Sequence, residues 1–347
     1  MDYLPELTRE RLTAWMTEHG LPKYRVDQIR RWIFQRRADA FEKMNDLPKK
    51  LRAELEVAFR LRCSSPAAHP ISSDGTEKLL LEFDDAQRIE TVLLRDDRGH
   101  RTACLSTQVG CAMGCVFCAS GLDGVVRNLT SGEIIEQMLQ VQALLPEDER
   151  LSHLVIMGVG EPLANLKGLL PALETATNPE AFGISARRIT ISTVGLPKGL
   201  RRLAKANIPY HVAISLHAPN DALRDELVPA NRGVGVLPIL RAADDYFDQT
   251  GRRITYEYVL LSGLNDQEEH ARELAALLRG RPAMINLIPY NPVRELPYRT
   301  PHAADVKRFG DILAKAGLNV QTRWLKGEGI DAACGQLRRS KGESESI

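Results

Sequence analysis

Short runs of β-branched and other apolar residues alternate with amphipathic segments along most of the chain beyond residue 118. The runs predict strands, with helices in the intervals, at 153–158, 188–193, 210–216, 253–261, 283–288 and 319–324. Thr130 and Glu133 have the spacing of a capping box, which predicts the start of the first helix. Strands that are mostly apolar and alternate with helices are typical of a parallel α/β sheet or barrel.

The first 96 residues have a different pattern. Apolar positions between Tyr24 and Phe59 recur at helical spacing, which predicts a small helical domain interrupted at residues 46–48. The stretch 64–75 is rich in Ser and Pro and is expected to be a linker or loop. Two β-rich runs follow, KLLLEF and IETVLL, with DDAQ as the turn between them.

These patterns divide the chain into four parts. The division is 1–62 as a helical accessory domain, 63–96 as a linker and β extension, 97–330 as the main α/β unit, and 331–347 as a C-terminal segment. The tail from Arg338 is polar and is expected to be disordered.

Composition and charge favour a globular protein of the cytoplasm. Apolar residues make up 44% of the 347 residues and charged residues 26%. The N-terminus lacks the pattern of a secretion signal, and no apolar run approaches the ~18 residues of a membrane span. We therefore expect no membrane association, and nothing in the sequence suggests more than a monomer.

The net charge of +1 conceals two basic segments. Residues 181–220 hold six Lys and Arg and no acidic residue, and residues 21–60 hold eleven Lys and Arg against six Asp and Glu. Such segments are either solvated helix faces or a phosphate-binding surface.

Four of the six cysteines lie close together, at Cys104, Cys111, Cys115 and Cys118. The last three form C-x3-C-x2-C on a loop after a strand expected within TACLSTQV. Zinc sites usually add a second, distant cysteine pair, which is absent here, whereas three close thiolates suit an iron–sulfur cluster with one iron open to a ligand. Zinc binding and unliganded cysteines stay as alternatives, and Cys63, which matches no motif, is expected to be structural.

Polar residues gather where the predicted parallel strands end, which is the edge that carries the chemistry of such barrels. They are the runs Gly160-Glu161-Pro162, Ser192-Thr193 and Ser215-Leu216-His217, together with Asn291. Any one of them is explained as well by a cap or a turn, but four in register indicate a site.

The cysteine motif, with Phe117 before its last cysteine and a GEP run after the next strand, resembles the radical S-adenosylmethionine (SAM) superfamily. The resemblance implies a partial (β/α)6 barrel whose [4Fe-4S] cluster is held by Cys111, Cys115 and Cys118. Its open iron would chelate the methionine part of SAM, and electron transfer would release a 5′-deoxyadenosyl radical.

Cys104, Cys334, SLHAPND, ISTVG and the helical N-terminal part together resemble the RlmN/Cfr family of RNA adenosine methyltransferases, over residues 20 to 337. The resemblance implies as substrates an adenosine of 23S rRNA and, in the RlmN branch, the adenosine 3′ to the anticodon of tRNA. It also implies an electron donor such as flavodoxin. The basic residues Arg201 and Arg202 would then belong to an RNA footprint.

The same resemblance implies a role for each catalytic residue. Cys334 takes a methyl group from one SAM, a second SAM supplies the radical, and the methylene radical adds to the adenine. Cys104 then attacks the sulfur of Cys334 to form a transient disulfide, and Glu90 accepts the adenine proton. Without the resemblance, a buried structural Cys334, a strand Cys104 and a solvent-facing Glu90 explain these residues as well.

Cofactor contacts are implied for Gly160 and Glu161 at the methionine amino group, and for Ser192, Ser215, Leu216, His217 and Asn291. The sequence departs from relatives at Val159. Val109 and LHAPND favour methylation of adenine C2 over the C8 chemistry of the Cfr branch, which has a cysteine in place of Val109. Two rivals from other classes are a radical enzyme acting on a protein or metabolite, and a zinc-bound RNA-binding module without activity.

Overall fold

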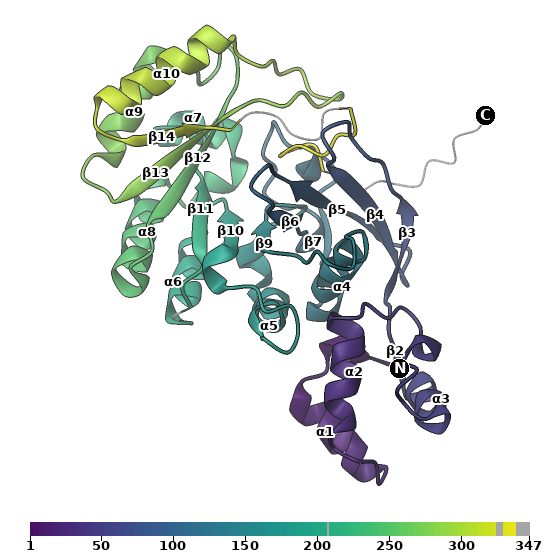
Figure 1. Cartoon of the computed structure of the whole chain (residues 1–347). Coiled ribbons are helices and arrows are strands. Elements are labelled where there is room, and N and C mark those ends of the chain that lie inside the picture. Colours follow the sequence, from purple (N-terminus) through teal and green to yellow (C-terminus); the bar gives the residue numbers. More distant parts are fainter. Residues whose placement is uncertain (207, 324–328, 338–347) are drawn as a thin grey trace, which may run out of the picture.

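The computed structural model describes residues 1–206, 208–323 and 329–337, and its centre is one ten-stranded sheet (Figure 1). The strand order is β14-β13-β12-β11-β10-β9-β6-β5-β4-β3. These strands are β3 (Ser64–Ala68), β4 (Glu77–Phe83), β5 (Arg88–Arg95), β6 (Arg101–Cys104), β9 (His153–Ile156), β10 (Ile189–Thr193), β11 (His211–Ser215), β12 (Ile254–Leu260), β13 (Ala283–Pro289) and β14 (Asn319–Thr322).

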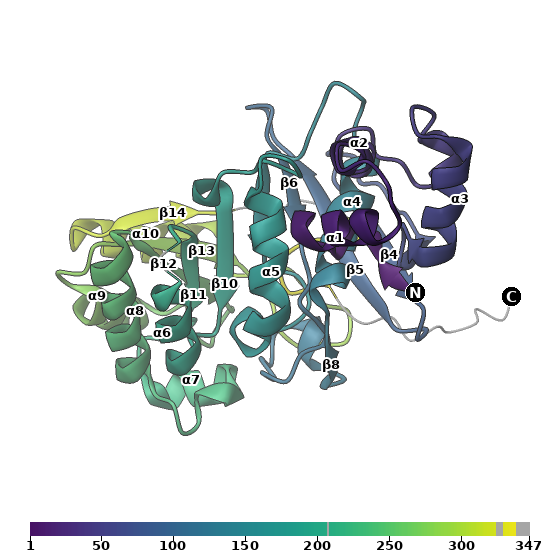
Figure 2. The same ribbon diagram turned by 90° about the horizontal axis from the view of Figure 1, so that it is seen from below.

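Seven of these strands, β6 and β9 to β14, are parallel and form the partial barrel expected from the sequence. Every strand predicted from an apolar run is confirmed, although Trp324, at the end of the last run, lies outside the described residues. Helices lie along the outside of the sheet (Figure 2). They are α4 (Ser131–Ala143), α5 (Leu166–Thr177), α6 (Pro197–Lys205), α7 (Asp221–Leu227), α8 (Val236–Thr250), α9 (Glu268–Leu278) and α10 (Ala303–Lys315).

The remaining sheet strands, β3 to β5, form an antiparallel extension on the β6 edge. The expected DDAQ turn joins β4 to β5, with Ala86 in the left-handed region at φ 58°. The prediction of a loop at 64–75 was wrong in its first part, because residues 64–68 form β3. This strand lies at the sheet edge, where Pro66 removes no needed hydrogen bond, and its register shifts between Pro66 and Ala68.

The N-terminal unit is helical, as predicted, and packs against α4. Its elements are β1 (Asp2–Tyr3), η1 (Leu4–Glu6), α1 (Arg9–Glu18), α2 (Arg25–Phe34), η2 (Phe41–Lys43), α3 (Lys49–Ala58) and β2 (Phe59–Arg60). The Tyr3 hydroxyl donates to the buried Glu136 carboxylate, and Gln142 Nε2 donates to the Phe34 carbonyl at 2.7 Å. Arg37 Nη1 donates to the carbonyls of Leu145 (2.6 Å) and Pro146 (3.0 Å) beyond α4. Polar contacts therefore fix this unit to the barrel.

Helix α4 begins as the capping box predicts. Thr130 Oγ1 accepts from the Glu133 amide at 3.1 Å, and Glu133 Oε2 accepts from the Thr130 amide at 2.8 Å. Before it, β7 (Gln108–Gly110) pairs with β8 (Val125–Asn128) and closes the loop that carries the cysteine motif. Gly110 has φ +77°, and a Cβ there would lie 2.0 Å from the Gly124 carbonyl oxygen, so this closure requires glycine.

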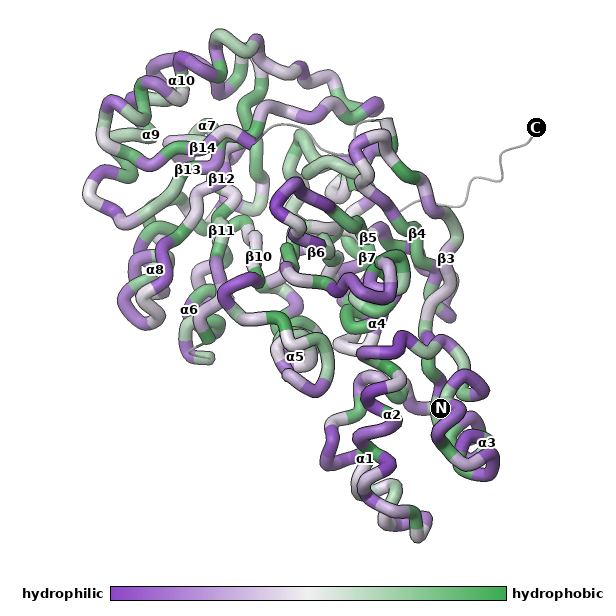
Figure 3. The backbone as a smooth tube through the Cα atoms, viewed as in Figure 1, coloured by the Kyte–Doolittle hydropathy of each residue, from purple (hydrophilic) through white to green (hydrophobic). Residues whose placement is uncertain are grey.

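Hydrophobic residues follow the inner strands and α4, whereas polar residues alternate with them on α1 to α3 (Figure 3). None of the helices in the described part of the chain is long and apolar enough to cross a membrane. The tail from Arg338, expected to be disordered, lies outside the described residues. The shorter helices are η3 (Ala119–Gly121), η4 (Pro162–Asn165), η5 (Ala186–Arg188) and η6 (Pro229–Asn231).

Candidate active site

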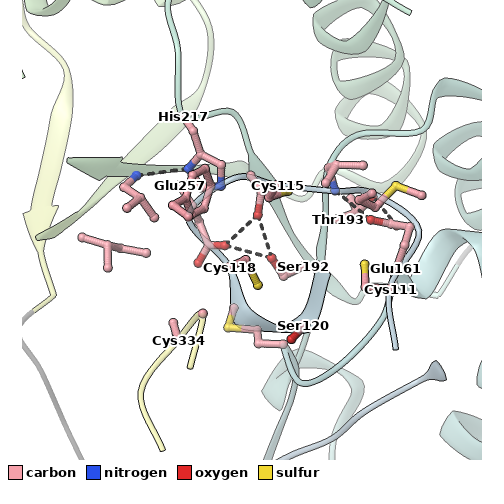
Figure 4. A pocket seen from close by; sticks show the side chains of 18 of the residues that line it. Cys111, Cys115, Cys118, Ser120, Glu161, Ser192, Thr193, His217, Glu257 and Cys334 are labelled. Atoms are coloured by element: carbon pink, nitrogen blue, oxygen red, sulfur yellow. Dashed lines mark hydrogen bonds between the residues drawn. The ribbon is translucent and has the colours of Figure 1, made fainter. Parts of the chain in front are cut away.

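The three cysteines of the motif line one cavity at the carboxyl ends of the parallel strands (Figure 4). We call this the loop cavity, and its lining includes Cys111, Cys115, Cys118, Gly160, Glu161, Ser192, Ser215, His217, Glu257, Asn291 and Cys334. The loop is held at both ends, because the Val116 amide donates to the Leu227 carbonyl at 3.1 Å and the Ala119 amide to the Gly335 carbonyl at 2.8 Å. The structure thus brings together nearly all residues predicted to bind cofactors.

Burial makes the three thiols poor acids on their own. It raises the pKa of Cys111 to about 11 and also raises the pKa values of Cys115 and Cys118. Such thiols become ligands when a metal cation replaces the proton. Among the described residues, no three His, Cys, Asp or Glu side chains converge as ligands of a single metal ion. Three close thiols on one loop suit a cluster in which each thiolate binds a different iron.

Glu161 is 2% exposed, and both its carboxylate oxygens face protein donors. Oε1 accepts from the Leu163 amide (2.9 Å) and Thr193 Oγ1 (2.6 Å), and Oε2 accepts from the Val194 amide (2.9 Å). Burial raises the pKa of Glu161, and these bonds oppose that effect. Since a carboxylate oxygen has two lone pairs, Oε2 can still accept from an ammonium group in the cavity.

Gly160 precedes this carboxylate and leaves no room for a side chain. Its φ is +106°, and a Cβ there would lie 2.6 Å from Cβ of Gln108. Gln108 in turn accepts from the Glu161 amide through Oε1 at 2.8 Å. The turn after β9 therefore depends on glycine and on a glutamine that the sequence analysis missed.

Glu257 on β12 is a further residue that the sequence analysis missed. Its carboxylate is buried in the loop cavity, where Oε2 accepts from Ser192 Oγ at 2.8 Å and from Ser215 Oγ at 3.4 Å (Figure 4). The hydroxyls of Ser192 and Ser215 lie 3.3 Å apart. This group of one carboxylate and two hydroxyls can bind the hydroxyl groups of a sugar.

His217 lies in the loop cavity as a neutral imidazole. Its Nδ1 accepts from the Val259 amide at 3.0 Å, so the proton is on Nε2, and the ring meets Phe117 edge-on at 5.0 Å. Burial, with a smaller effect from the nearby Arg224 charge, lowers the pKa of His217 to about 3. The neighbouring Leu216 instead packs its side chain into the main core and does not line the cavity, contrary to expectation.

A second cavity lies beside the first. We call it the thiol cavity, and it is lined by Val92, Leu94, Cys104, Val155, Arg323, Ala332, Ala333 and Leu337, and by four residues shared with the loop cavity: Met157, Ile288, Asn291 and Cys334. Cys334 therefore faces both the cysteine motif and Cys104. All six cysteines are free thiols in this structure, so Cys104 and Cys334 are not bonded.

Electrostatics in the thiol cavity depend on Arg323, which the sequence analysis also missed. Burial and the neighbouring Cys334 raise the pKa of Cys104 to about 12, and Arg323 opposes that shift. The pKa of Arg323 itself is raised, chiefly by Cys334. Arg323 is therefore a cation that favours the thiolate form of Cys104.

The C-terminal segment, residues 329–337, carries Cys334 and is held by several parts of the fold. Ser120 Oγ donates to the Leu337 carbonyl at 2.5 Å, and Asn291 Nδ2 donates to the Cys334 carbonyl at 3.2 Å. Gln336 Nε2 donates to the Pro292 carbonyl at 2.8 Å. The predicted cofactor contact Asn291 therefore also positions the backbone of Cys334.

Glu90 lines neither cavity but lies on the sheet face that borders the thiol cavity. It is two residues from Val92 on β5, and Val92 pairs with Cys104 on β6. Its Oε1 lies 3.0 Å from Nζ of Lys78, a residue that the sequence analysis read only as the start of a strand. The predicted solvent-facing alternative for Glu90 was wrong, since it is 6% exposed.

The remaining candidates lie away from both cavities. Arg201 and Arg202 are exposed on α6 in the outer helical layer, and Arg201 Nε lies 3.4 Å from Asp245 on α8. Cys63, expected to be structural, is buried, and burial raises its pKa.

Comparison with known proteins gives consistent family matches. Residues 3–61 match the family model "Ribosomal RNA large subunit methyltransferase N-terminal domain", and residues 105–275 match the radical SAM superfamily. The chain is 58% identical over 342 residues to a "Probable dual-specificity RNA methyltransferase RlmN" of Rhodopirellula baltica, which covers 99% of this chain and 92% of the relative. A protein of the same description from Symbiobacterium thermophilum is 44% identical, covering 96% and 91%.

A solved structure agrees over almost the whole fold. The crystal structure of a radical SAM methyltransferase from Sphaerobacter thermophilus has a TM-score of 0.94 and 40% identity, covering 97% of this chain and 99% of that one. The resemblance found in the sequence is thus confirmed, and the alternative without enzymatic activity is set aside. Two adjoining cavities joined by one cysteine, and relatives matched from end to end, lead to one conclusion: the chain belongs to the RlmN family of radical SAM RNA methyltransferases.

Proposed function

We propose that this enzyme methylates C2 of an adenosine in 23S rRNA, and of the adenosine 3′ to the anticodon in tRNA, through Cys334. The observation that carries the proposal is that Cys334 lines both cavities, facing the three motif cysteines on one side and Cys104 on the other. The relatives described as dual-specificity RNA methyltransferases support the two classes of RNA.

The loop cavity would hold the cofactors that the superfamily implies. Cys111, Cys115 and Cys118 would bind a [4Fe-4S] cluster, and Gly160 and Glu161 would face the methionine amino group of SAM. Ser192, Ser215 and Glu257 suit the ribose hydroxyls, and the Nε2–H of His217 supplies a further donor. When bound, the cluster and two SAM molecules per turnover would supply an electrophilic methyl group and a radical that removes a hydrogen atom.

Cys334 would accept the methyl group because adenine C2 is not a nucleophile, whereas a thiolate is. Its position on the wall between the cavities lets the same sulfur receive a methyl group on one side and present it to a base on the other. The methylated sulfur would then be linked to the RNA through its carbon, which makes a covalent adduct.

Release of the product would use residues of the other cavity. The adduct formed by radical addition would give up its unpaired electron to an acceptor such as the oxidised cluster, and Glu90 would accept the adenine C2 proton as the ring regains its aromaticity. The Cys104 thiolate would attack the sulfur of Cys334, so that the S–S bond forms while the S–C bond breaks and the electron pair goes to carbon, which takes a proton and becomes the methyl group. A reductant must then return both thiols.

The RNA must present an unstacked base, so phosphate contacts and RNA shape should dominate its binding. We assign the N-terminal unit (1–62) and the basic residues of α6 to that binding, the β extension (63–96) to Glu90, and residues 97–330 to the cofactors. We further propose that the reaction takes place in the cytoplasm, with a monomeric enzyme and a flavodoxin-type electron donor.

The decisive experiment uses SAM with a trideuterated methyl group. Reconstituted protein, reductant and unmodified 23S rRNA or tRNA are incubated anaerobically, and the nucleosides are analysed by mass spectrometry. We expect 2-methyladenosine that retains two of the three deuteriums, because one is lost when the methyl group becomes a methylene. Appearance of 8-methyladenosine would assign the Cfr-type product instead, and SAM cleavage without any methylated adenosine would overturn the RNA substrate.

A further inference from the structure

Two opposite charges are buried next to each other in the β extension. Lys78 on β4 is 9% exposed and Glu90 on β5 is 6% exposed, and their Nζ and Oε1 atoms lie 3.0 Å apart. Lysine is almost never buried unless it is paired. Since a buried ion pair is often no more stabilising than apolar residues of the same volume, stability alone is a weak explanation for this pair.

The register of the strands places the pair on the face that borders the thiol cavity. Lys78 pairs with Val92 on β5, and Val92 pairs with Cys104 on β6. Glu90 is two residues from Val92, so its side chain leaves the same face of the sheet. Lys78, Glu90 and Cys104 therefore share one face.

The lysine also reaches the segment that carries Cys334. Lys78 Nζ donates to the Asp331 carbonyl at 3.2 Å, three residues before Cys334. Asp331 has φ 48°, a left-handed conformation that is costly for a residue other than glycine and persists where contacts hold it. One ammonium group thus joins the β extension to the C-terminal segment.

We propose that Lys78 is a positioning residue for resolution of the protein–RNA adduct, fixing the Glu90 carboxylate relative to the segment that carries Cys334. The proposal rests on the proposed function, in which Glu90 accepts the adenine proton while Cys334 holds the base. Lys78 contributes no reacting atom. Its effect is geometric, because a proton acceptor must lie within hydrogen-bonding reach, and a misplacement of about 1 Å can cost on the order of 100-fold in rate.

A single-turnover experiment with the reconstituted holoenzyme tests this role. Lys78→Met removes the ammonium at similar size, Lys78→Arg keeps the charge, and Lys307→Met makes the same change on the exposed face of α10. Denaturing gels follow the covalent protein–RNA species, and chromatography follows 5′-deoxyadenosine. For Lys78→Met we expect adduct formation and 5′-deoxyadenosine release as in the wild type, with decay of the adduct slowed about 10-fold or more.

Lys78→Arg and Lys307→Met serve as controls for the loss of the ammonium group at position 78. Lys78→Arg should recover part of the decay rate, and Lys307→Met should behave as the wild type. Equal slowing of adduct formation, SAM cleavage and adduct decay in Lys78→Met would indicate a general structural defect and overturn the proposal. If Lys78→Met does not fold, Lys78→Arg decides alone, because decay at the wild-type rate with its altered geometry would overturn the proposal.

A double-mutant cycle tests whether Lys78 acts through Glu90. Glu90→Gln should slow adduct decay, and adding Lys78→Met should slow it no further. If the two substitutions together slow adduct decay by the product of their separate effects, Lys78 does not act through Glu90, and the proposal is overturned. Hydrogen exchange of the C-terminal segment offers a measurement independent of turnover, with faster exchange expected in Lys78→Met than in Lys307→Met. A wild-type enzyme that forms no adduct would instead refute the proposed function itself, which separates the two failures.

Discussion

The loop cavity and the thiol cavity are lined by different kinds of side chain, although they share Cys334. The loop cavity presents thiols, a carboxylate linked to two serine hydroxyls, and a neutral imidazole, at the ends of four successive strands. The thiol cavity is mainly apolar, and among the residues that the structure describes Arg323 is the cation in its lining, together with Cys104. In the proposed function, the loop cavity would bind the cofactors, and the thiol cavity would be where Cys104 breaks the carbon–sulfur bond by thiol exchange. Because Cys334 lines both cavities, the two proposed steps would take place in different surroundings.

The largest effects should come from removing one cysteine on each side of that wall. Cys334→Ala should abolish both the adduct and the methylated product, because no sulfur remains to carry the methyl group. Cys104→Ala should still form the adduct but fail to resolve it, so a covalent protein–RNA species should accumulate on denaturing gels. If both variants lose the adduct, the division of labour between the cavities is refuted.

A smaller effect should be confined to the loop cavity. Glu257→Gln removes the charge that accepts from Ser192 and Ser215. A hydrogen bond to a charged group contributes about 1.5–3 kcal/mol, so we expect SAM affinity to fall about 10- to 100-fold. Equilibrium binding to the reconstituted protein measures this, with Glu226→Gln on the exposed side of α7 as control. Unchanged SAM affinity would remove Glu257 from the cofactor site.

The pH dependence of stability should also distinguish the two cavities. Burial lowers the pKa of His217 from 6.5 to about 3, so below pH 6.5 the unfolded chain binds a proton that the folded protein does not. The free energy of unfolding should therefore fall by up to about 1.4 kcal/mol per pH unit between pH 6 and 5 from this residue. Urea unfolding should show this slope in the wild type and in Cys104→Ala, and a weaker slope in His217→Gln.

The smallest effect should leave both cavities unchanged. Reversing Arg201 and Arg202 to Glu should weaken RNA binding and reduce the salt dependence of log Kd by about 1 to 2 units of slope, if both contact phosphates. SAM cleavage should stay at the wild-type rate. RNA affinity is measured over a series of salt concentrations. If the variant binds RNA as the wild type does throughout, α6 is excluded from the RNA footprint.

Much of the fold could be predicted from the sequence, because its parallel strands are buried on both faces and read as continuous apolar runs. The edge strand at 64–68 was missed because Ser, Pro and Ala carry no apolar pattern, and its strand conformation comes from pairing with β4. Residues 64–68 alone do not include β4, so their own sequence could not predict this pairing. Conversely, the capping box at Thr130 and Glu133 is entirely local, and it was predicted correctly.

The candidate site was predictable where a motif lies within a few residues, as for the cysteines and the strand ends. Glu257, Arg323 and Lys78 were missed because a charged residue in or next to a strand, outside any motif, reads as a solvent-facing position. Glu257 and Lys78 are buried because of how their strands pair and pack with other parts of the fold, and Arg323 lines the thiol cavity just beyond β14. Leu216 shows the opposite error, since a residue inside a motif can turn its side chain into the core.

The docking of the N-terminal unit has a consequence for how such enzymes can change in evolution. The Tyr3 hydroxyl, the Phe34 carbonyl and the Arg37 guanidinium all find their partners on α4 or just beyond it. Exchange of this unit between relatives would leave buried polar groups without partners unless α4 came with it. Because α4 directly follows the cysteine loop, the accessory unit and the radical core should be inherited as one piece rather than shuffled as separate modules.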